Sequence, residues 1–206
     1  MKLKKKFKII LAIIIILVLA VTAFFVYRHF TTNNKKPTEV TVISKIDSYG
    51  YQLESNKTKV YNDLFNHLKE VLTGDNIDEE EYVKTIAQLF LVDFYTLKNK
   101  LSNADIGGVQ FLAPSIQENF ILKAKNTIYK YVKSNIYGDR EQTLPEVKEV
   151  TVDEVTMESF EYGENKDEQA YKVKCTIHYV EDLGYDTEKE LIFVHEDNKL
   201  VLVEMN

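Results

Sequence analysis

The chain has 206 residues with 26 Lys and Arg, 32 Asp and Glu, and one cysteine, Cys175, which excludes an internal disulfide. Residues 1–28 hold six of the basic residues and none of the acidic ones, so the remainder has 20 basic and 32 acidic residues, a net charge of −12. Because an acidic surface repels phosphate backbones, we expect no direct binding of nucleic acid by this remainder.

The first expected element is a transmembrane helix over residues 9–27. These 19 residues carry no charge, and a helix of that length spans roughly 28 Å, close to the ~30 Å hydrocarbon core of a bilayer. Residues 1–8 hold five lysines, whereas three basic residues lie between positions 28 and 36. By the positive-inside rule, residues 1–8 form a cytoplasmic tail and the C-terminal domain is extracellular. We therefore expect a single-pass protein of the cell membrane that contacts lipid through residues 9–27.

A cleaved signal peptide is the alternative for the same stretch. Ala23 is a small residue suited to a cleavage site, with Val21 two residues before it. However, Phe24 to Tyr27 continue the apolar run past that site, whereas signal peptides have cores of about 7–15 residues and a polar break near the cut. The length favours a retained anchor, and cleavage after Ala23 stays open.

A linker and then a single domain are expected after the anchor. Residues 28–45 are rich in Asn, Thr and Lys around Pro37, which is typical of a solvated linker. Residues 46–206 are numerous enough for one extracytoplasmic domain with a hydrophobic core.

Helices are expected in the first half of this domain. Apolar residues at helical spacing predict one helix over residues 57–73, ended by Gly74. A second begins at Asp78, which can cap the free amides together with Glu81, and its apolar pattern continues to Leu101.

A turn, a short strand and a third helix are expected next. The paired glycines of "DIGG", residues 105–108, predict the turn, and "VQFLA", residues 109–113, predicts the strand. The third helix is expected to begin at Ser115, with Glu118 completing a second capping box, and to end near Gly138.

The hydrophobic period changes from helical to two after Pro145. Alternating segments predict about four antiparallel strands, at residues 147–155, 170–180, 189–196 and 199–205. In the second of these, Tyr171, Val173 and Cys175 should share one face. Residues 196–198 predict a hairpin turn. The expected fold class is α+β, with three helices packed on one face of an antiparallel sheet.

This order of elements resembles the NTF2-like (cystatin-like) fold, in which helices precede a strongly curved antiparallel sheet. Behind a single membrane helix, it looks most like the assembly-factor subunits of bacterial type IV secretion and conjugation systems. The resemblance covers nearly the whole chain as architecture and carries over no functional residues. It implies a scaffold or assembly subunit of an envelope complex, without enzymatic activity, whose partners are other envelope proteins or further copies of itself.

Asp93 is the candidate residue for a ligand pocket, together with Tyr95. Asp93 follows Ile86 and Phe90 and precedes Leu97 at helical offsets, so it lies on an apolar stripe. A buried carboxylate must be paired, hydrogen-bonded or protonated. It is either a general acid or base in a pocket between helices and sheet, or a structural acceptor for a Tyr or a backbone amide. We favour the structural role because neither His nor a second acid lies close by in sequence.

Thirteen tyrosines are many for this length, and tyrosine is favoured at protein interfaces because it combines a large rigid ring with a polar tip. The interface candidates are Tyr49, Tyr51, Tyr129, Tyr131 and Tyr137.

His178 and His195 lie on adjacent expected strands and could approach each other, but two imidazoles make a poor metal site. We therefore expect neither a metal nor another cofactor.

Two classes of function follow from these features. The leading hypothesis is the scaffold or assembly subunit that the resemblance implies. The alternative is a surface-tethered domain of NTF2-like fold with a small-ligand-binding or catalytic pocket around Asp93.

Overall fold

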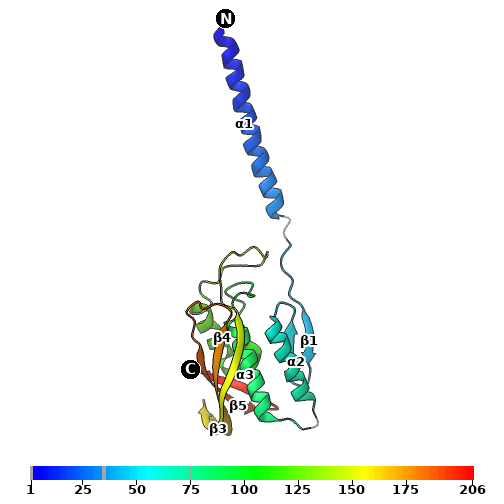
Figure 1. The fold of residues 1–206 in the computed structure, drawn as a ribbon, viewed down its shortest axis with the longest axis vertical. Helices are drawn as coiled ribbons and strands as arrows, with labels where there is room; N and C mark the ends of the chain where they lie inside the picture. The colour runs from blue at the N-terminus through cyan, green and yellow to red at the C-terminus, as the bar shows by residue number, and fades with distance from the viewer. Residues whose placement is uncertain (1, 34–35, 75) are drawn as a thin grey trace. The chain divides into compact units, whose positions relative to one another are not determined.

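The structure is a computed structural model that describes residues 2–33, 36–74 and 76–206 (Figure 1). It divides into an N-terminal unit up to Thr38 and a domain from Glu39 to Asn206. In the first unit, α1 (Lys2–Asn33) contains a stretch, Phe7–Arg28, that is long and apolar enough to cross a membrane. Thr22 is the one threonine in that stretch. Its hydroxyl donates to the carbonyl of Leu19 at 3.0 Å, so this polar group is satisfied within the helix.

A hairpin opens the domain where a linker was expected. β1 (Val42–Ile46) pairs antiparallel with β2 (Tyr51–Glu54), and Gly50 supplies the positive φ, +68°, of the turn. The prediction of a linker over residues 28–45 was therefore wrong from Val42 onward. β1 exposes most of its side chains, so its apolar pattern is weak, and its pairing depends on β2.

The next two helices agree with the sequence. α2 (Lys59–Thr73) is capped by the hydroxyl of Thr58, and α3 (Glu79–Tyr95) is capped by Asp78, which accepts from the Glu81 amide at 3.1 Å. α3 lies between α2 and the sheet, so it is covered on more than one side (Figure 1). It ends at Tyr95 rather than near Leu101.

The end of α3 is set by a long-range contact. The Thr96 hydroxyl accepts from the Val147 amide at 3.1 Å, and the Leu97 amide donates to the Pro145 carbonyl at 3.0 Å. These two bonds to the segment that leads into the sheet replace further turns of the helix. Apolar spacing alone continued beyond this point and could not reveal the competing contact.

The following two elements differ from expectation. Residues 109–111 form a single 3₁₀ turn, η1 (Val109–Phe111), and only Leu112 makes a parallel bridge, to Leu202. α4 (Pro114–Asn126) begins with Pro114 at its first turn and has no side-chain cap, so the capping box from Ser115 was wrong. The helix ends at Asn126, and residues 127–138 continue as turns and irregular chain.

The sheet confirms the predicted α+β class and its antiparallel meander. Its four strands, in spatial order, are β3 (Val147–Tyr162), β4 (Asn165–Tyr179), β5 (Glu188–Glu196) and β6 (Lys199–Met205). Tyr171, Val173 and Cys175 share the buried face, as their alternation predicted. Asp197 adopts a positive φ, 54°, in the predicted turn between β5 and β6.

Cys175 should be inert in the folded protein. Its side chain is buried, and burial, followed by the charge of Asp153, raises the pKa of the thiol to about 12. We expect no labelling by a thiol-specific reagent at neutral pH until urea unfolds the domain. Rapid stoichiometric labelling without urea would contradict this placement of β4.

Candidate functional site

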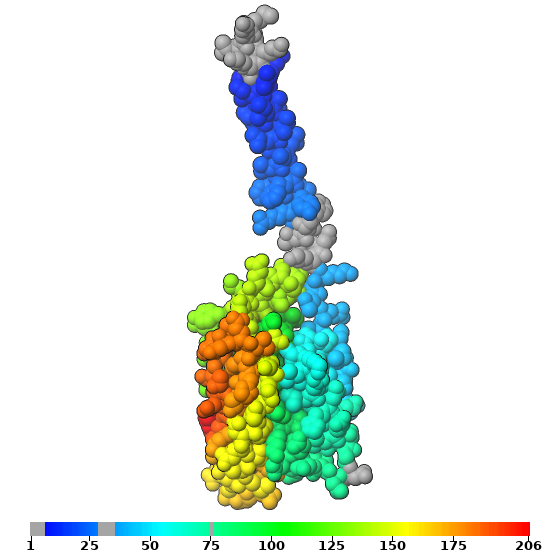
Figure 2. All heavy atoms as spheres, viewed as in Figure 1, coloured from blue at the N-terminus to red at the C-terminus, as the bar shows by residue number. Residues whose placement is uncertain are grey.

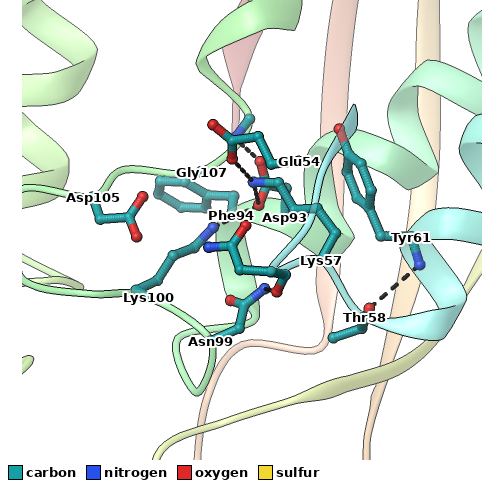
Figure 3. A network of polar contacts seen from close by, with 12 residues as sticks. Glu54, Lys57, Thr58, Tyr61, Asp93, Phe94, Asn99, Lys100, Asp105 and Gly107 are labelled. Carbon is teal, nitrogen blue, oxygen red and sulfur yellow. Dashed lines mark hydrogen bonds and ion pairs between the residues drawn. The ribbon is translucent and has the colours of Figure 1, made fainter. Parts of the chain in front are cut away.

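Asp93 lies at the centre of a charged cluster (Figure 3). Its Oδ1 accepts from the Nζ atoms of Lys57, at 2.8 Å, and Lys100, at 2.5 Å. Its Oδ2 accepts from the backbone amide of Gly108 at 2.8 Å. α3 supplies the carboxylate, the loop after α3 supplies Lys100 and the glycine, and the turn between β2 and α2 supplies Lys57.

The three charged side chains are removed from water. The exposed fractions are 5% for Asp93, 1% for Lys100 and 7% for Lys57, and Lys57 is also 3.1 Å from Glu54. Burial alone would raise the pKa of Asp93, but attraction by Lys100 and then Lys57 outweighs it and holds that pKa well below its usual range. Asp93 is therefore ionised at neutral pH and already accepts three hydrogen bonds, which suits a structural carboxylate and not a general base.

A polar hollow of about 320 Å³ lies beside the cluster. Its lining includes Asp93, Lys57 and Asp105, and Gln110 closes one side by bonding the backbone of Gln52 at both its amide and its carbonyl. Tyr95 does not line this hollow. Its buried ring packs edge-on against Phe94 with centroids 5.0 Å apart, so the structure does not bring the two candidate pocket residues to one site.

Gly107 permits the close approach on which the cluster depends. A Cβ at this position would lie 2.2 Å from the carbonyl oxygen of Asp93 and 2.6 Å from Nζ of Lys100. We expect Gly107→Ala to lower the free energy of unfolding by about 1–3 kcal/mol, as overpacking does, measured by urea denaturation. Gly74→Ala is the control, because its nearest neighbour would be 3.6 Å away. Equal stability of the two variants would argue against this packing.

The cluster should also make stability depend on acid pH. Since the pKa of Asp93 is lower in the folded chain than its ordinary value of 3.8, its contribution is complete above about pH 5 and is lost as pH falls through 3.8 toward the folded value. We expect the urea midpoint to fall steeply below about pH 4. In Asp93→Ala this part of the fall should be absent, and an identical pH profile in both proteins would contradict the assignment.

A second cluster, which the sequence did not indicate as a unit, joins Asp167 and His195. Asp167 Oδ2 accepts from the backbone amide of His195 at 2.7 Å and lies 2.8 Å from its Nδ1. Although burial raises the pKa of Asp167, these bonds lower it overall. The other ring nitrogen of His195 is 3.6 Å from Glu79 at the start of α3. This arrangement fixes the ring of His195 and ties the sheet to α3.

The strand register separates His178 and His195, which adjacent strands could have brought together. β4 and β5 pair from Tyr171 opposite Phe193 to Thr176 opposite Glu188, which leaves His178 and His195 toward opposite ends of the ladder. His178 instead contacts the hydroxyl of Thr151 at 3.2 Å. Within the ranges that the structure describes, no three His, Cys, Asp or Glu side chains are grouped to hold a metal.

The interface candidates fall into two groups. Tyr49, Tyr51 and Tyr129 are buried in the core, so their rings offer no surface to a partner. Tyr129 instead accepts from the Gly107 amide and donates to a backbone carbonyl of α3. Tyr131 and Tyr137 are exposed, at 74% and 52%.

Comparisons of the chain with family models, with curated protein sequences and with solved structures found no match. The apolar N-terminal helix and the geometry described above are therefore the basis for assigning a function. They combine a helix that can cross a membrane with a domain whose buried carboxylate is occupied by two lysines.

Proposed function

We propose that this protein is a membrane-anchored, extracytoplasmic scaffold or assembly subunit of a bacterial envelope complex, such as a secretion or conjugation system. The proposal assigns residues 9–27 to the bilayer and an NTF2-like fold to the domain. The observation that carries it is the apolar stretch Phe7–Arg28 in front of an acidic domain. Tethering confines a binding domain to a thin layer and so raises the effective concentration of partners in the same membrane.

The state of Asp93 supports a role without catalysis. A general base needs a pKa near the working pH and a free lone pair directed at substrate. Asp93 has a depressed pKa and is held by Lys57, Lys100 and the Gly108 amide. Its role in this proposal is to fix the loop after α3 against the helices.

A small-ligand-binding domain is the second candidate, and an apolar hollow favours it. This hollow, about 340 Å³, lies between α4 and β6 and is lined by Phe94, Phe120, Leu202 and Met205, among others. Its volume matches the lower end of small-molecule sites. In this alternative, the domain holds a small apolar ligand near the cell surface.

Crosslinking in intact membranes tests the scaffold proposal. The full chain, tagged at its C-terminus, is expected to sediment with membranes and to give discrete crosslinked products with other envelope proteins or with itself. The matched control replaces residues 1–28 with a cleavable signal peptide, and should lose both membrane retention and those products. A mature protein released into the medium and beginning at Phe24 would overturn the proposal. So would turnover of a small substrate that Asp93→Asn abolishes without unfolding the domain.

A further inference from the structure

The last turn of α4 and the segment after it have a composition unlike the rest of the domain. Residues 122–138 contain four lysines and no acidic residue, in a region of the chain whose net charge is −12. All four lysines are exposed, and within the described part of the chain none of them takes part in an ion pair. This is a local run of exposed basic residues in an acidic domain.

Exposed apolar side chains accompany these charges. Tyr131, Ile136 and Tyr137 are exposed, at 74%, 40% and 52%, and Nζ of Lys130 lies 5.2 Å from the centroid of the Tyr131 ring. A tyrosine ring with its polar tip is favoured at the depth of lipid headgroups, and lysines are attracted to anionic lipids. Exposed lysines beside exposed tyrosines therefore suit binding to an anionic membrane surface.

The same segment lies at the end of the domain where the anchor joins it. Thr41 and Ser55 exchange hydrogen bonds of 3.1 and 2.9 Å, and next to them the Asn56 carbonyl accepts from the side chain of Asn99. Arg140 then donates to the carbonyls on both sides of Asn99, at 2.6 and 2.9 Å. In Figure 2 the yellow-green segment and the light-blue start of the domain are at the same end.

The length of the connecting chain limits how far this end of the domain can lie from the apolar helix. The thirteen residues from Arg28 to Thr41 reach at most about 45 Å when fully extended. If residues 9–27 lie in the bilayer, Thr41 therefore stays within this reach of the membrane surface.

We propose that residues 130–137 form a docking surface for the anionic phosphodiester headgroups of the bilayer that carries the anchor. Lys130 and Lys133 bind the headgroups, and the rings of Tyr131 and Tyr137 lie at the interface between headgroups and acyl chains. The contact orients the acidic remainder of the domain away from the membrane, which repels it. This inference rests on residues 9–27 remaining in the bilayer, as proposed above.

The absence of tryptophan from the sequence provides a clean reporter. Tyr131→Trp introduces the only tryptophan. The full chain is reconstituted into vesicles of phosphatidylcholine alone, or of phosphatidylcholine with about 30% of the anionic lipid phosphatidylglycerol. We expect blue-shifted emission and quenching by lipids with brominated acyl chains, stronger with phosphatidylglycerol. Lys130→Gln with Lys133→Gln should lower the equilibrium constant of the contact about 25-fold, because each lysine near an anionic surface contributes about fivefold.

Two further reporters separate the outcomes. Phe25→Trp lies in α1 and should be quenched in both kinds of vesicle if the anchor spans the bilayer, so a failure there concerns the anchor alone. Val147 bonds Thr96, next to the carbonyls of residues 97 and 98 that Arg140 holds at the proposed docking end. Met157→Trp lies ten residues further along β3, about 33 Å at the rise of a strand, and should not be quenched. If Phe25→Trp is quenched but Tyr131→Trp is not in either vesicle, the docking surface is refuted. Shielding of Tyr131→Trp only by an added protein would also refute it.

Discussion

Asp93→Ala is expected to lower the free energy of unfolding by about 3–5 kcal/mol, the largest effect of any single change considered. The change leaves Lys100, with 1% of its side chain exposed, and Lys57, with 7%, without their shared counter-charge. Lys57 keeps Glu54 at 3.1 Å, but the buried Lys100 ammonium then has to deprotonate or draw water into the site, and both cost free energy. Urea denaturation followed by circular dichroism measures the loss, and labelling of Cys175 gives an independent probe.

Two control variants identify the source of this loss. Asp63→Ala breaks the exposed pair between Lys59 and Asp63 on α2, and should cost less than about 1 kcal/mol because water screens such pairs. Asp93→Leu combined with Lys100→Met replaces the buried pair by apolar groups, which is often neutral or stabilising. We therefore expect the double variant to be more stable than Asp93→Ala. A double variant that is less stable would show that the network at Asp93 contributes more than its charges cost to bury.

Local signals in the sequence predicted most of the helical layer. Asp78 and Glu81 lie one turn apart, and the predicted cap by Asp78 is present at the start of α3, although the Glu81 carboxylate contacts His67 at 2.7 Å instead of returning the bond. The alternation around Val173 likewise predicted the buried face of β4. In each case the residues that determine the structure lie within a few positions of one another.

Elements that depend on distant partners were missed or misplaced. β1 forms because β2 satisfies its backbone, and α3 ends where Thr96 meets Val147, 51 residues away. α4 stops at Asn126 although the apolar spacing continues, because the following residues turn so that Tyr129 is buried under α3. No short-range pattern contains these contacts.

The candidate site shows the same limit. The position of Asp93 on an apolar stripe indicated a buried carboxylate that needs partners, and the backbone amide of Gly108 is one of the two kinds of partner expected. Lys57 and Lys100 were not anticipated, because they come from separate loops, 36 and 7 residues away. A lysine following an apolar helix is too common to indicate burial. Their convergence on one oxygen is visible only in the fold.

Arg140→Ala is expected to have the second largest effect, a loss of roughly 3–4 kcal/mol in the free energy of unfolding. The guanidinium donates to four backbone carbonyls, at 2.6, 2.9, 3.0 and 3.3 Å, and thereby joins the loop after α3 to residues 133–140. Arg140→Lys keeps the charge but replaces the planar fork by one ammonium, so it should recover less than half of the loss. Full recovery by Arg140→Lys would show that the charge alone is sufficient.

Hydrogen exchange locates the effect of Arg140→Ala. The Asn135 amide donates to the Leu101 carbonyl at 2.7 Å, and the side chain of Asn135 accepts from the Arg140 amide. We expect the Asn135 amide to lose protection while amides in the centre of α3 keep theirs, since the loop opens locally.

The lysines and tyrosines of residues 130–137 remain in this variant, but they must be ordered before they can dock, and ordering costs conformational entropy. Tyr131→Trp in the Arg140→Ala background should therefore be quenched less by brominated lipid than Tyr131→Trp alone. Equal quenching would mean that the composition of the segment, and not its fixed conformation, is sufficient for membrane contact.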